Sequence, residues 1–447
     1  MDSFIIEGGR RLKGVVNISG SKNSSLPLMA ACLMAEGRTT LQGVPRLTDI
    51  DSMSHLLRDL GCKVERHEPA PSLLNAGPAL DGDLEITVES EAESHARYEI
   101  VKTMRASICV LGPLLAKRGK AIVALPGGCA IGDRPIDLHL QGLRKLGAEF
   151  RTENGNIIGT VPRRLKGCRM YLGGAQGPTV LGTINVMTAA ALAEGETLIV
   201  GAACEPEVVD CAELLNKMGA RIRGHGSPEI RVEGVDRLTG CVHRIIPDRI
   251  EAGTYMMAAA ITNGELELRN CNLDHLVAVT DMLEEVGVRI VRENGVVRCW
   301  SERRLNPAEM TTQPYPGFPT DLQAQLMALL CLADGMSMVT ERVFPDRFLH
   351  VGELNRMGAR IRKEGATAIV HGVRELQGAT VMASDLRASA ALVLAGLAAR
   401  GTTRLDRIYH IDRGYEKIEE KLAAVGAAIR RVSEAPAATE TAAVRAA

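Results

Sequence analysis

Aromatic side chains are scarce in this chain of 447 residues. They make up 3% of it and include one tryptophan, Trp300. Proteins that hold single-stranded nucleic acid usually stack its bases on aromatic rings, so this composition argues against such a surface. The formal net charge is −1 at pH 7, so the chain also lacks the overall positive field that attracts a phosphate backbone. Any anion-binding surface must therefore be local.

Long apolar runs are also missing. The longest nearly apolar stretch, residues 388–399, is too short to span a bilayer. The segment MDSFIIEGGRRLKG lacks the apolar core of a secretory signal peptide. The eleven cysteines include no C-x-x-C pair, which excludes zinc-ribbon spacing. We therefore expect a cytoplasmic protein with no membrane partner, in which most cysteines are small buried hydrophobes.

What the chain has instead is an internal repeat. The pattern L-x-x-[LMV]-G-[AVC]-x-[IVF] occurs six times, about every 70 residues. Its glycines are Gly61, Gly147, Gly219, Gly287, Gly358 and Gly426. A second motif precedes each of them, an Ala- and Leu-rich segment that ends in a glycine and leads into a β-type run. The glycines of this second motif are Gly37, Gly119, Gly195, Gly264, Gly335 and Gly401.

Each repeat predicts two helices, each closed by a glycine at its C-terminal cap and followed by a strand. Six such units divide naturally into two lobes of three. The alternative is a solenoid, but units of this length that mix strand with helix argue against it. The segment 433–447 has few bulky apolar groups and is expected to be a disordered tail.

Polar clusters that interrupt the repeat are the candidates for chemistry. Around Lys22 and Asn23, backbone N–H groups and an ammonium group precede an apolar helix and could hold a phosphate or a carboxylate. The alternative is a simple helix N-cap formed by Ser21 or Asn23. The segment lacks the Walker A pattern, so it is not a P-loop.

Cys129 stands between glycines in LPGGCAIGDRPIDLH, with Arg134 and His139 close by in the sequence. A thiol near cations has a lowered pKa and becomes reactive. The alternative is that Cys129 is one more buried cysteine. The other ten stand in apolar or strand-like segments, so its glycine-rich context favours a reactive thiol.

Asp321 and a set of arginines complete the candidates. Asp321 follows a Pro-Thr turn at the start of an apolar helix, where it is either a helix cap or a functional carboxylate. Arginine binds carboxylates and phosphates through two parallel hydrogen bonds, although a single arginine is more often half of a surface ion pair. The set comprises Arg105, Arg134, Arg249, Arg387 and Arg413. Several stand near helix starts in different repeats, which could aim them at one cleft.

Eight segments carry a resemblance to a known family. They occur in the order KNSSLPLMAA, VKTMRAS, LPGGCAIGDRPIDLH, EPEVVD, PDRIEAGTY, FPTDLQAQ, ASDLRASAALVLAG and DRIYHIDRGYEKIEEKL. From about residue 1 to 432 the chain resembles the UDP-N-acetylglucosamine 1-carboxyvinyltransferase family, enolpyruvyl transferases of peptidoglycan synthesis. The resemblance implies an α/β (α+β) fold of two inside-out α/β barrels, with six β-α-β-α-β-β repeats, three per lobe. The lobes would span 22–242, and 1–21 together with 243–432, with the active site between them.

The resemblance also implies the reaction. Enolpyruvyl passes from phosphoenolpyruvate to the 3′-hydroxyl of UDP-N-acetylglucosamine by addition and elimination, and phosphate is released. We expect no cofactor, no metal and no nucleic-acid partner, and a monomer or a weak homo-oligomer. Cys129 matches the proton donor that forms a covalent adduct and is alkylated by fosfomycin, and Asp321 matches the candidate base.

Further site residues are implied in the same way. Contacts to phosphoenolpyruvate match Lys22, Asn23, Arg134 and Arg413, of which Lys22 and Arg413 are also expected to be catalytic. Contacts to the sugar nucleotide match Arg105, Arg134, Pro135, Ile136, Asp137, Leu138, His139, Gly177, Pro178, Thr179, Val180, Asp321 and Val343. Supporting positions match Glu205, Asp385 and Arg387.

Two features depart from the family pattern. The stretch 173–183 has no lysine, and Thr48 stands where some members carry a basic residue. Both bear on nucleotide affinity more than on chemistry. The alternatives are a paralogue acting on another nucleotide, the sister enzyme 5-enolpyruvylshikimate-3-phosphate synthase, and a non-catalytic binding protein of the same fold. The sister family lacks the cysteine loop in this form.

Overall fold

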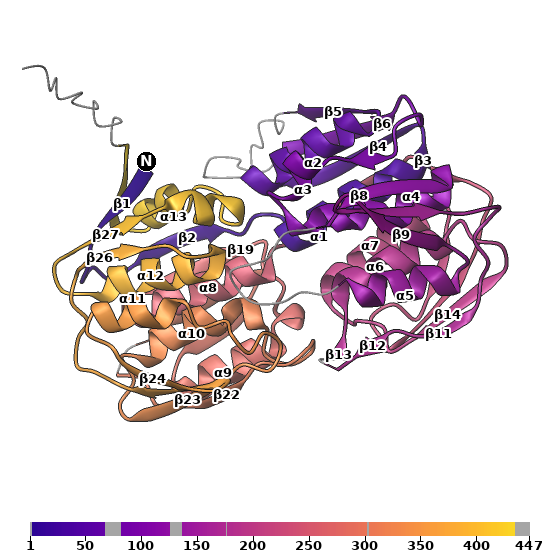
Figure 1. Ribbon diagram of the computed structural model, residues 1–447. Coiled ribbons are helices and arrows are strands. Elements are labelled where there is room, and N and C mark those ends of the chain that lie inside the picture. Colours follow the sequence, from indigo (N-terminus) through magenta and orange to yellow (C-terminus); the bar gives the residue numbers. More distant parts are fainter. Residues whose placement is uncertain (1, 68–81, 126–135, 176, 302–303, 434–447) are drawn as a thin grey trace, which may run out of the picture.

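Two lobes lie side by side in the computed structural model, which describes residues 2–67, 82–125, 136–175, 177–301 and 304–433 (Figure 1). The chain passes between the lobes twice, and the two crossover segments run antiparallel, with Gly20 paired to Pro247. The backbone N–H of Ser21 donates to Ile246, and that of Asp248 donates to Ser19. The two-lobe α/β fold predicted from the sequence is confirmed.

The first lobe contains three four-stranded sheets among the described residues. In each one, an edge strand runs parallel to its neighbour and the other pairs are antiparallel. In spatial order the strands are β18 (Val242–Arg244), β4 (Arg38–Val44), β6 (Gly82–Val88) and β5 (Cys62–His67); β7 (His95–Ala96), β8 (Lys120–Ala124), β10 (Asn156–Thr160) and β9 (Glu149–Glu153); β11 (Arg169–Tyr171), β14 (Glu196–Val200), β16 (Glu229–Glu233) and β15 (Arg221–Arg223). Two short ribbons pair β3 (Ala35–Glu36) with β17 (Leu238–Thr239), and β12 (Gly173–Gly174) with β13 (Gly177–Pro178).

The second lobe repeats this arrangement with three more four-stranded sheets. The strands in spatial order are β2 (Lys13–Asn17), β19 (Glu265–Arg269), β21 (Val296–Trp300) and β20 (Arg289–Glu293); β22 (Glu309–Thr311), β23 (Met336–Thr340), β25 (Thr367–His371) and β24 (Arg360–Glu364); β26 (Thr380–Met382), β27 (Thr402–Asp406), β1 (Asp2–Glu7) and β28 (Ala428–Ser433). In the last sheet, β1 comes from the start of the chain and lies between β27 and β28, antiparallel to both.

The strands near the two crossovers show where each lobe begins and ends. The N-terminal strands β1 and β2 belong to the second lobe, while β18 pairs with β4 in the first. The expected boundary between 242 and 243 falls inside β18, so the first lobe includes this strand to its end. Ser433, expected in the tail, is the last residue of β28, and 434–447 lie outside the described residues.

The longer helices are of two kinds. Helices of the first kind are buried on almost every side, and in the second lobe three of them pack against one another. They are α1 (Lys22–Ala31), α4 (Leu111–Arg118), α6 (Val180–Ala190), α8 (Arg249–Ile261), α10 (Gln323–Leu330) and α12 (Leu386–Ala398). Helices of the second kind keep an exposed face: α2 (Thr48–Asp59), α5 (Asp137–Lys145), α7 (Pro206–Lys217), α9 (Val277–Val286), α11 (His350–Arg356) and α13 (Ile418–Ala424). Shorter turns of helix are α3 (Tyr98–Val101), η1 (Cys32–Met34), η2 (Arg105–Val110), η3 (Leu273–His275), η4 (Thr320–Leu322) and η5 (Ile408–Arg413).

The first-motif glycines lie at or directly after the C-caps of their helices, as predicted. The prediction is wrong for most of the second motif, where only Gly119 is a C-cap and the other glycines stand beyond the helix end, in the turn into the next strand. All six glycines of the first motif and five of the second have positive φ. At the sixth position, Asn263 takes the left-handed conformation (φ 48°) and Gly264 does not. Gly264 is needed there for a different reason, since a Cβ at this position would lie 2.3 Å from the carbonyl oxygen of Leu12.

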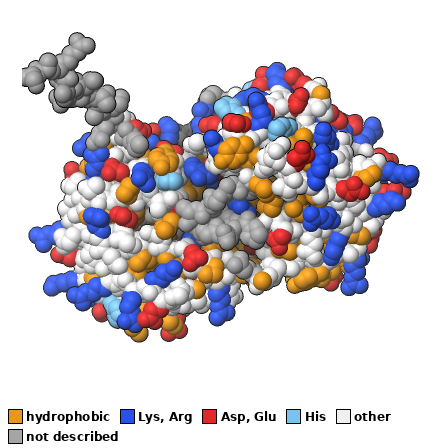
Figure 2. All heavy atoms as spheres, viewed as in Figure 1, with side chains coloured by type: hydrophobic (Ala, Val, Ile, Leu, Met, Phe, Trp, Pro, Cys, Tyr) orange, Lys and Arg blue, Asp and Glu red, His pale blue; other side chains and the backbone are white. Residues whose placement is uncertain are grey.

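Buried apolar side chains form two cores that follow the lobes. One core draws on residues 26–245, and the other on 4–18 and 250–429. The ten described cysteines are all free, and six of them are buried. None of the helices in the described ranges has the length and apolar composition needed to cross a bilayer. Figure 2 shows Lys/Arg and Asp/Glu side chains interspersed over the viewed face.

Candidate active site

A cleft of about 680 Å³ lies between the lobes. Its first-lobe wall includes the starts of α1, α2, α5 and α6, and its second-lobe wall includes the loop 313–319, η4 and the end of η5. The predicted site residues that line it are Lys22, Asn23, Arg105, Asp137, Leu138, His139, Gly177, Pro178, Thr179, Val180, Glu205, Asp321, Val343 and Arg413. Folding therefore brings together candidates from both ends of the sequence.

Other predicted residues lie off the cleft wall. Ile136 packs against the first-lobe core, and Asp385 and Arg387 stand behind the wall at the start of α12. Thr48 is exposed at the start of α2, and its hydroxyl donates to the carbonyl of Asp412 in the other lobe over 3.5 Å. Three further calls, Cys129, Arg134 and Pro135, lie outside the described residues.

The start of α1 presents an ammonium and an amide to the cleft. Ser21 is the N-cap, since its hydroxyl accepts a hydrogen bond from the N–H of Ser24 (3.2 Å). Asn23 is not a cap, because its Nδ2 donates to Oδ2 of Asp321 across the cleft (3.2 Å). The Nζ of Lys22 lies 2.8 Å from a carboxylate oxygen of Asp49. Burial lowers the pKa of Lys22, and neighbouring guanidinium groups lower it further while Asp49 raises it.

The carboxylate of Asp321 is bound by side chains of other segments, and the N-cap position of α10 is taken by Leu322. Arg347 Nη1 donates to Oδ1 of Asp321 (2.8 Å), and Arg387 Nη2 donates to Oδ2 of the same carboxylate (2.9 Å). Burial alone raises the pKa of Asp321, but these two guanidinium groups outweigh it and hold the pKa well below its usual range. The carboxylate is therefore ionised at neutral pH and oriented from two sides.

Asp385 fixes the arginine behind this carboxylate. Oδ1 of Asp385 accepts hydrogen bonds from the backbone N–H groups of Arg387 (2.9 Å) and Ala388 (3.1 Å), so Asp385 is the N-cap of α12. The Arg387 side chain is almost fully buried and its guanidinium carbon lies 5.4 Å from the centre of the Tyr415 ring. A guanidinium so enclosed is a fixed partner for Asp321.

An ion pair between the lobes lies at another part of the cleft. Arg249, at the start of α8, makes two hydrogen bonds to Glu207 of α7, at 2.9 and 3.2 Å. The Arg249 guanidinium lies over the ring of Tyr315, 5.7 Å from its centre. The N–H of Tyr315 donates to Glu205 Oε1 (3.4 Å), while Glu205 Oε2 is buried with no partner among the described residues. Burial raises the pKa of Glu205, because a charged carboxylate is poorly solvated in this enclosed position.

The first-lobe wall near α5 and α6 combines the charged residues Arg105 and Asp137 with an uncharged imidazole. Burial, helped by the charge of Arg105, lowers the pKa of His139 to about 3, so this imidazole is neutral near pH 7. Its Nδ1 lies 2.9 Å from Nδ2 of Asn185. The stretch expected to hold the nucleotide contributes Gly177 and the N-cap Thr179, whose hydroxyl accepts from the N–H of Gly182 (3.2 Å).

The residues that were not predicted for the site include three that line the cleft, and Arg347 behind its wall. Asp49 pairs with Lys22 and Arg413, and Arg347 is the second cation on Asp321. Glu207 and Tyr315 surround Arg249. Only Glu207 had a sequence signal, because it lies inside the EPEVVD motif. Asp49 reads as an ordinary acidic residue in the first turn of a helix, and Arg347 lies in a turn with no distinctive spacing.

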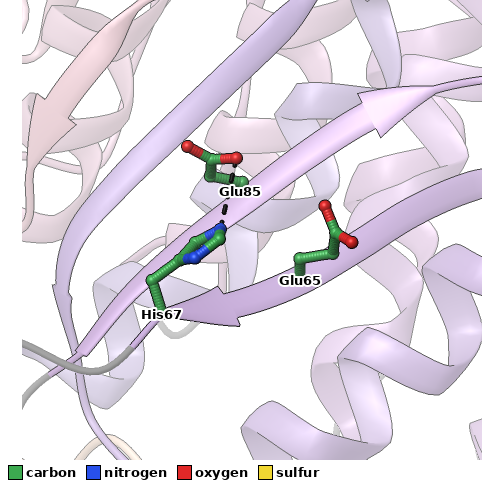
Figure 3. A group of neighbouring side chains, drawn as sticks. All are labelled: Glu65, His67 and Glu85. Atoms are coloured by element: carbon green, nitrogen blue, oxygen red, sulfur yellow. Dashed lines mark ion pairs between the residues drawn. The ribbon is translucent and has the colours of Figure 1, made fainter.

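One group of side chains in the described ranges is compact enough to share a metal ion. It consists of Glu65, His67 and Glu85 on β5 and β6, and in Figure 3 the imidazole of His67 faces Glu85. These residues are absent from the cleft wall. Lys63 already pairs with Glu65 (2.9 Å) and Arg38 with Glu85 (3.4 Å), so the group is part of a surface ion-pair network.

The chain matches one protein-family model over most of its length. The model is described as EPSP synthase (3-phosphoshikimate 1-carboxyvinyltransferase) and it matches residues 6–422. Among solved structures, the enolpyruvyl transferase NikO from Streptomyces tendae superposes with a TM-score of 0.85 at 24% identity, covering 97% of this chain and 99% of that one. EPSP synthase from Acinetobacter baumannii gives 0.74 at 19% identity, covering 97% of this chain and 100% of that one.

Curated relatives are much more similar in sequence. A protein of Trichlorobacter lovleyi is 52% identical over 97% of this chain and 100% of its own length. One from an Anaeromyxobacter species is 54% identical over 96% and 99%, and one from Nitratidesulfovibrio vulgaris is 54% identical over 97% and 100%. All three are named UDP-N-acetylglucosamine 1-carboxyvinyltransferase. The similarity therefore extends over both lobes and the cleft between them.

Proposed function

Because this chain belongs to the EPSP synthase family of enolpyruvyl transferases, we propose that it transfers enolpyruvyl from phosphoenolpyruvate to the 3′-hydroxyl of UDP-N-acetylglucosamine. Phosphate is the second product. The relatives that share more than half of its residues carry the name of this activity, which supports this acceptor over a shikimate. The reaction is a committed step of cytoplasmic peptidoglycan synthesis, and its inhibitor fosfomycin is expected to act on this chain.

The observation that carries the proposal is the charge arrangement of the cleft. Lys22 of the first lobe and Arg413 of the second share one carboxylate, so their positive groups lie close together at the same wall. Phosphoenolpyruvate carries a phosphate and a carboxylate, and charge-assisted hydrogen bonds from ammonium and guanidinium groups suit both. Because the cations that would bind one anion come from both lobes, the binding site has to lie between the lobes.

In the addition step, a proton goes to the methylene carbon of phosphoenolpyruvate and the acceptor hydroxyl attacks the neighbouring carbon. We assign the proton donor to Cys129 from the family resemblance. Asp321 is assigned to the acceptor hydroxyl. Its low pKa makes it a weak base, but the attacking oxygen becomes strongly acidic as the new C–O bond forms. A weak base in a fixed position is then sufficient, and Arg347 and Arg387 supply the fixed position.

In the elimination step, the thiolate left on Cys129 after addition takes a proton from the methyl group of the tetrahedral ketal, the C=C bond forms again, and the C–O bond to phosphate breaks. The leaving phosphate gains negative charge as that bond breaks. Lys22 and Arg413 can stabilise this charge without rearranging, since Asp49 already orients both. Every proton and electron pair of the two steps is supplied by the substrates and these side chains, so the sequence of steps needs no cofactor.

The acceptor would lie along the other wall, made by Asp137, Leu138, Thr179 and Val180. Neutral His139 fits this role, because an imidazole that stays uncharged can position a neighbour by hydrogen bonding without adding charge. The absence of a lysine in the stretch 173–183 predicts that the pyrophosphate depends on arginines such as Arg105.

The direct test is the identity of the product. The purified chain is incubated with phosphoenolpyruvate and UDP-N-acetylglucosamine, and the nucleotide fraction is analysed by mass spectrometry. We expect a sugar nucleotide that carries one enolpyruvyl ether, formed in the same amount as free phosphate. The Lys22→Ala variant, folded by circular dichroism, should form almost none. Unmodified UDP-N-acetylglucosamine after prolonged incubation with the unaltered chain would overturn the proposal.

A further inference from the structure

Asp49 is the shared partner of two cations that come from different lobes. Its Oδ2 lies 2.8 Å from Nζ of Lys22, at the start of α1 in the first lobe. Its Oδ1 accepts a hydrogen bond from Nε of Arg413 (2.9 Å), at the end of η5 in the second lobe. All three residues line the cleft. One carboxylate therefore sets the separation of two positive groups that no local sequence relationship connects.

The burial of these groups makes the shared carboxylate necessary. The side chains of Asp49 and Lys22 are 3% and 12% exposed, so neither charge is well solvated. The guanidinium of Arg413 would repel the Lys22 ammonium if the carboxylate were removed. Removing the carboxylate would leave the buried Lys22 ammonium uncompensated, which is far more costly than losing a surface pair, whereas Arg413 is 35% exposed and keeps contact with solvent.

An ordinary helix role does not explain the position of this carboxylate. Asp49 and Asp51 both stand in the first turn of α2, where negative charge favours the helix N-terminus. Asp51 is exposed and away from the cleft, whereas Asp49 is turned inward onto two cations. The N-cap of α2, Leu47, makes no side-chain hydrogen bond. Asp51 thus supplies a matched control, with the same charge on the same helix end.

We propose that Asp49 is a positioning residue for phosphoenolpyruvate, which holds Lys22 and Arg413 side by side so that both bind the same anion. The inference rests on the proposed function, because it names the reason why two lobes can act on one substrate. Asp49 touches the cations and acts through them. The contact of Thr48 with Asp412 over 3.5 Å joins the same two elements and supports their fixed register.

Asp49 also favours the charged form of Lys22. The groups that face Lys22 are Asp49 on α2, Asp248 at the N-cap of α8, Arg387 on α12 and Arg413 on η5. Asp248 is engaged by the backbone N–H of Lys22 (3.0 Å), while both arginines disfavour the ammonium. Burial and the arginines already lower the pKa of Lys22, and Asp49 opposes them. Without Asp49, Lys22 would lose its proton at a lower pH.

The test measures kcat/KM for phosphoenolpyruvate against pH, because this ratio reports ionisations of the free enzyme. Asp49→Asn should lower it about 10- to 100-fold near neutral pH, mainly through KM, since a charge-assisted interaction is lost. The alkaline limb of this pH profile, where kcat/KM falls as Lys22 loses its proton, should move to a pH lower by roughly one unit. Asp49→Glu should return the limb toward its original position, and Asp51→Asn should change neither quantity.

Two results would overturn the inference. The first is an Asp49→Asn variant with unchanged KM and an unchanged alkaline limb. The second is an equal loss in Asp49→Asn and Asp49→Glu with no shift of the limb, which a purely structural role would produce. If Asp49→Asn does not fold, Asp49→Ser is measured in the same way, since it also removes the charge.

A readout that needs no turnover separates this inference from the proposed function. Lysine side chains are labelled by 13C reductive methylation, and the signal of Lys22 is assigned by its absence in Lys22→Arg. Its pKa should be lower in Asp49→Asn than in the unaltered chain, even if the chain proved inactive with these substrates. An equal pKa in the two proteins contradicts the inference. Failure of product formation by the unaltered chain contradicts only the proposed function.

Discussion

Glu207 of the first lobe and Arg249 of the second form a bidentate ion pair across the cleft, at 2.9 and 3.2 Å. Their side chains are 4% and 9% exposed. A pair so enclosed differs from the many surface pairs of this protein, because neither charge can turn to water when the other is removed. It is the second place, after Asp49 and Arg413, where an ion pair fixes one lobe against the other.

Breaking the buried pair should destabilise the protein. Glu207→Gln leaves Arg249 buried without a counter-charge, which we expect to lower the free energy of unfolding by roughly 3 kcal/mol. Thermal unfolding should show a drop of several degrees. The control is Glu196→Gln, which removes an exposed partner of Arg231 and should change the midpoint little. Equal midpoints for Glu207→Gln and the unaltered chain would contradict this reading of the pair.

Asp321 should contribute stability over a defined pH range. Its pKa is lowered in the folded protein, so its ion pairs stabilise fully above the ordinary carboxyl pKa of about 3.9. The contribution is lost only as pH falls through the lower folded-state value. Asp321→Asn should therefore be less stable than the unaltered chain near pH 7, and this difference should shrink near pH 3. A difference that is constant across that range would exclude a titrating pair.

The same variant should lose most of its turnover. Removing a positioned base typically costs about 100- to 10,000-fold in rate. We expect the loss for Asp321→Asn in kcat, because the proposed role concerns the acceptor hydroxyl during addition. Steady-state kinetics with both substrates varied separates kcat from KM. A nearly normal kcat for Asp321→Asn would show that another group acts as the base.

Glu205 should show the opposite pH dependence from Asp321. Burial raises its pKa in the folded protein, so the stability it contributes is complete below the ordinary glutamate pKa of about 4.3. That stability is lost as pH rises through the raised folded-state value. Glu205→Gln, which is neutral at every pH, should gain midpoint temperature relative to the unaltered chain between about pH 4 and pH 8. A gain that does not grow with pH would mean that the pKa of Glu205 is not raised in the folded protein.

One thiol should dominate the reactivity of the native protein. Burial raises the pKa of Cys109 and Cys271 to about 12, so these thiols stay protonated and unreactive near neutral pH. Cys129→Ser should abolish labelling by fosfomycin and remove most turnover. Cys204→Ser is the control, because Cys204 is half-buried next to the cleft residue Glu205 and should leave labelling intact. Peptide mapping that finds the label on another cysteine would disprove the assignment.

The sequence predicted the parts of this molecule that depend on local pattern. The two lobes and the glycines that end the second helix of each repeat follow from the local pattern, and most of the residues expected at the site line one cleft. Partnerships across the cleft could not be read in the same way, because residues such as Asp49 and Arg413 meet only after both lobes have folded. Asp321 shows the difference: its sequence context allowed a helix cap, and its packing instead gives it two arginines.

Acceptor-dependent phosphate release tests most directly whether the cleft joins phosphoenolpyruvate to UDP-N-acetylglucosamine. Initial rates are measured with phosphoenolpyruvate and one of three acceptors: UDP-N-acetylglucosamine, UMP or shikimate 3-phosphate. We predict release with the first acceptor and almost none with the other two. Release with UMP or shikimate 3-phosphate but not with UDP-N-acetylglucosamine would contradict the assigned acceptor. No release with any of them would contradict the assignment of the chain as an enzyme.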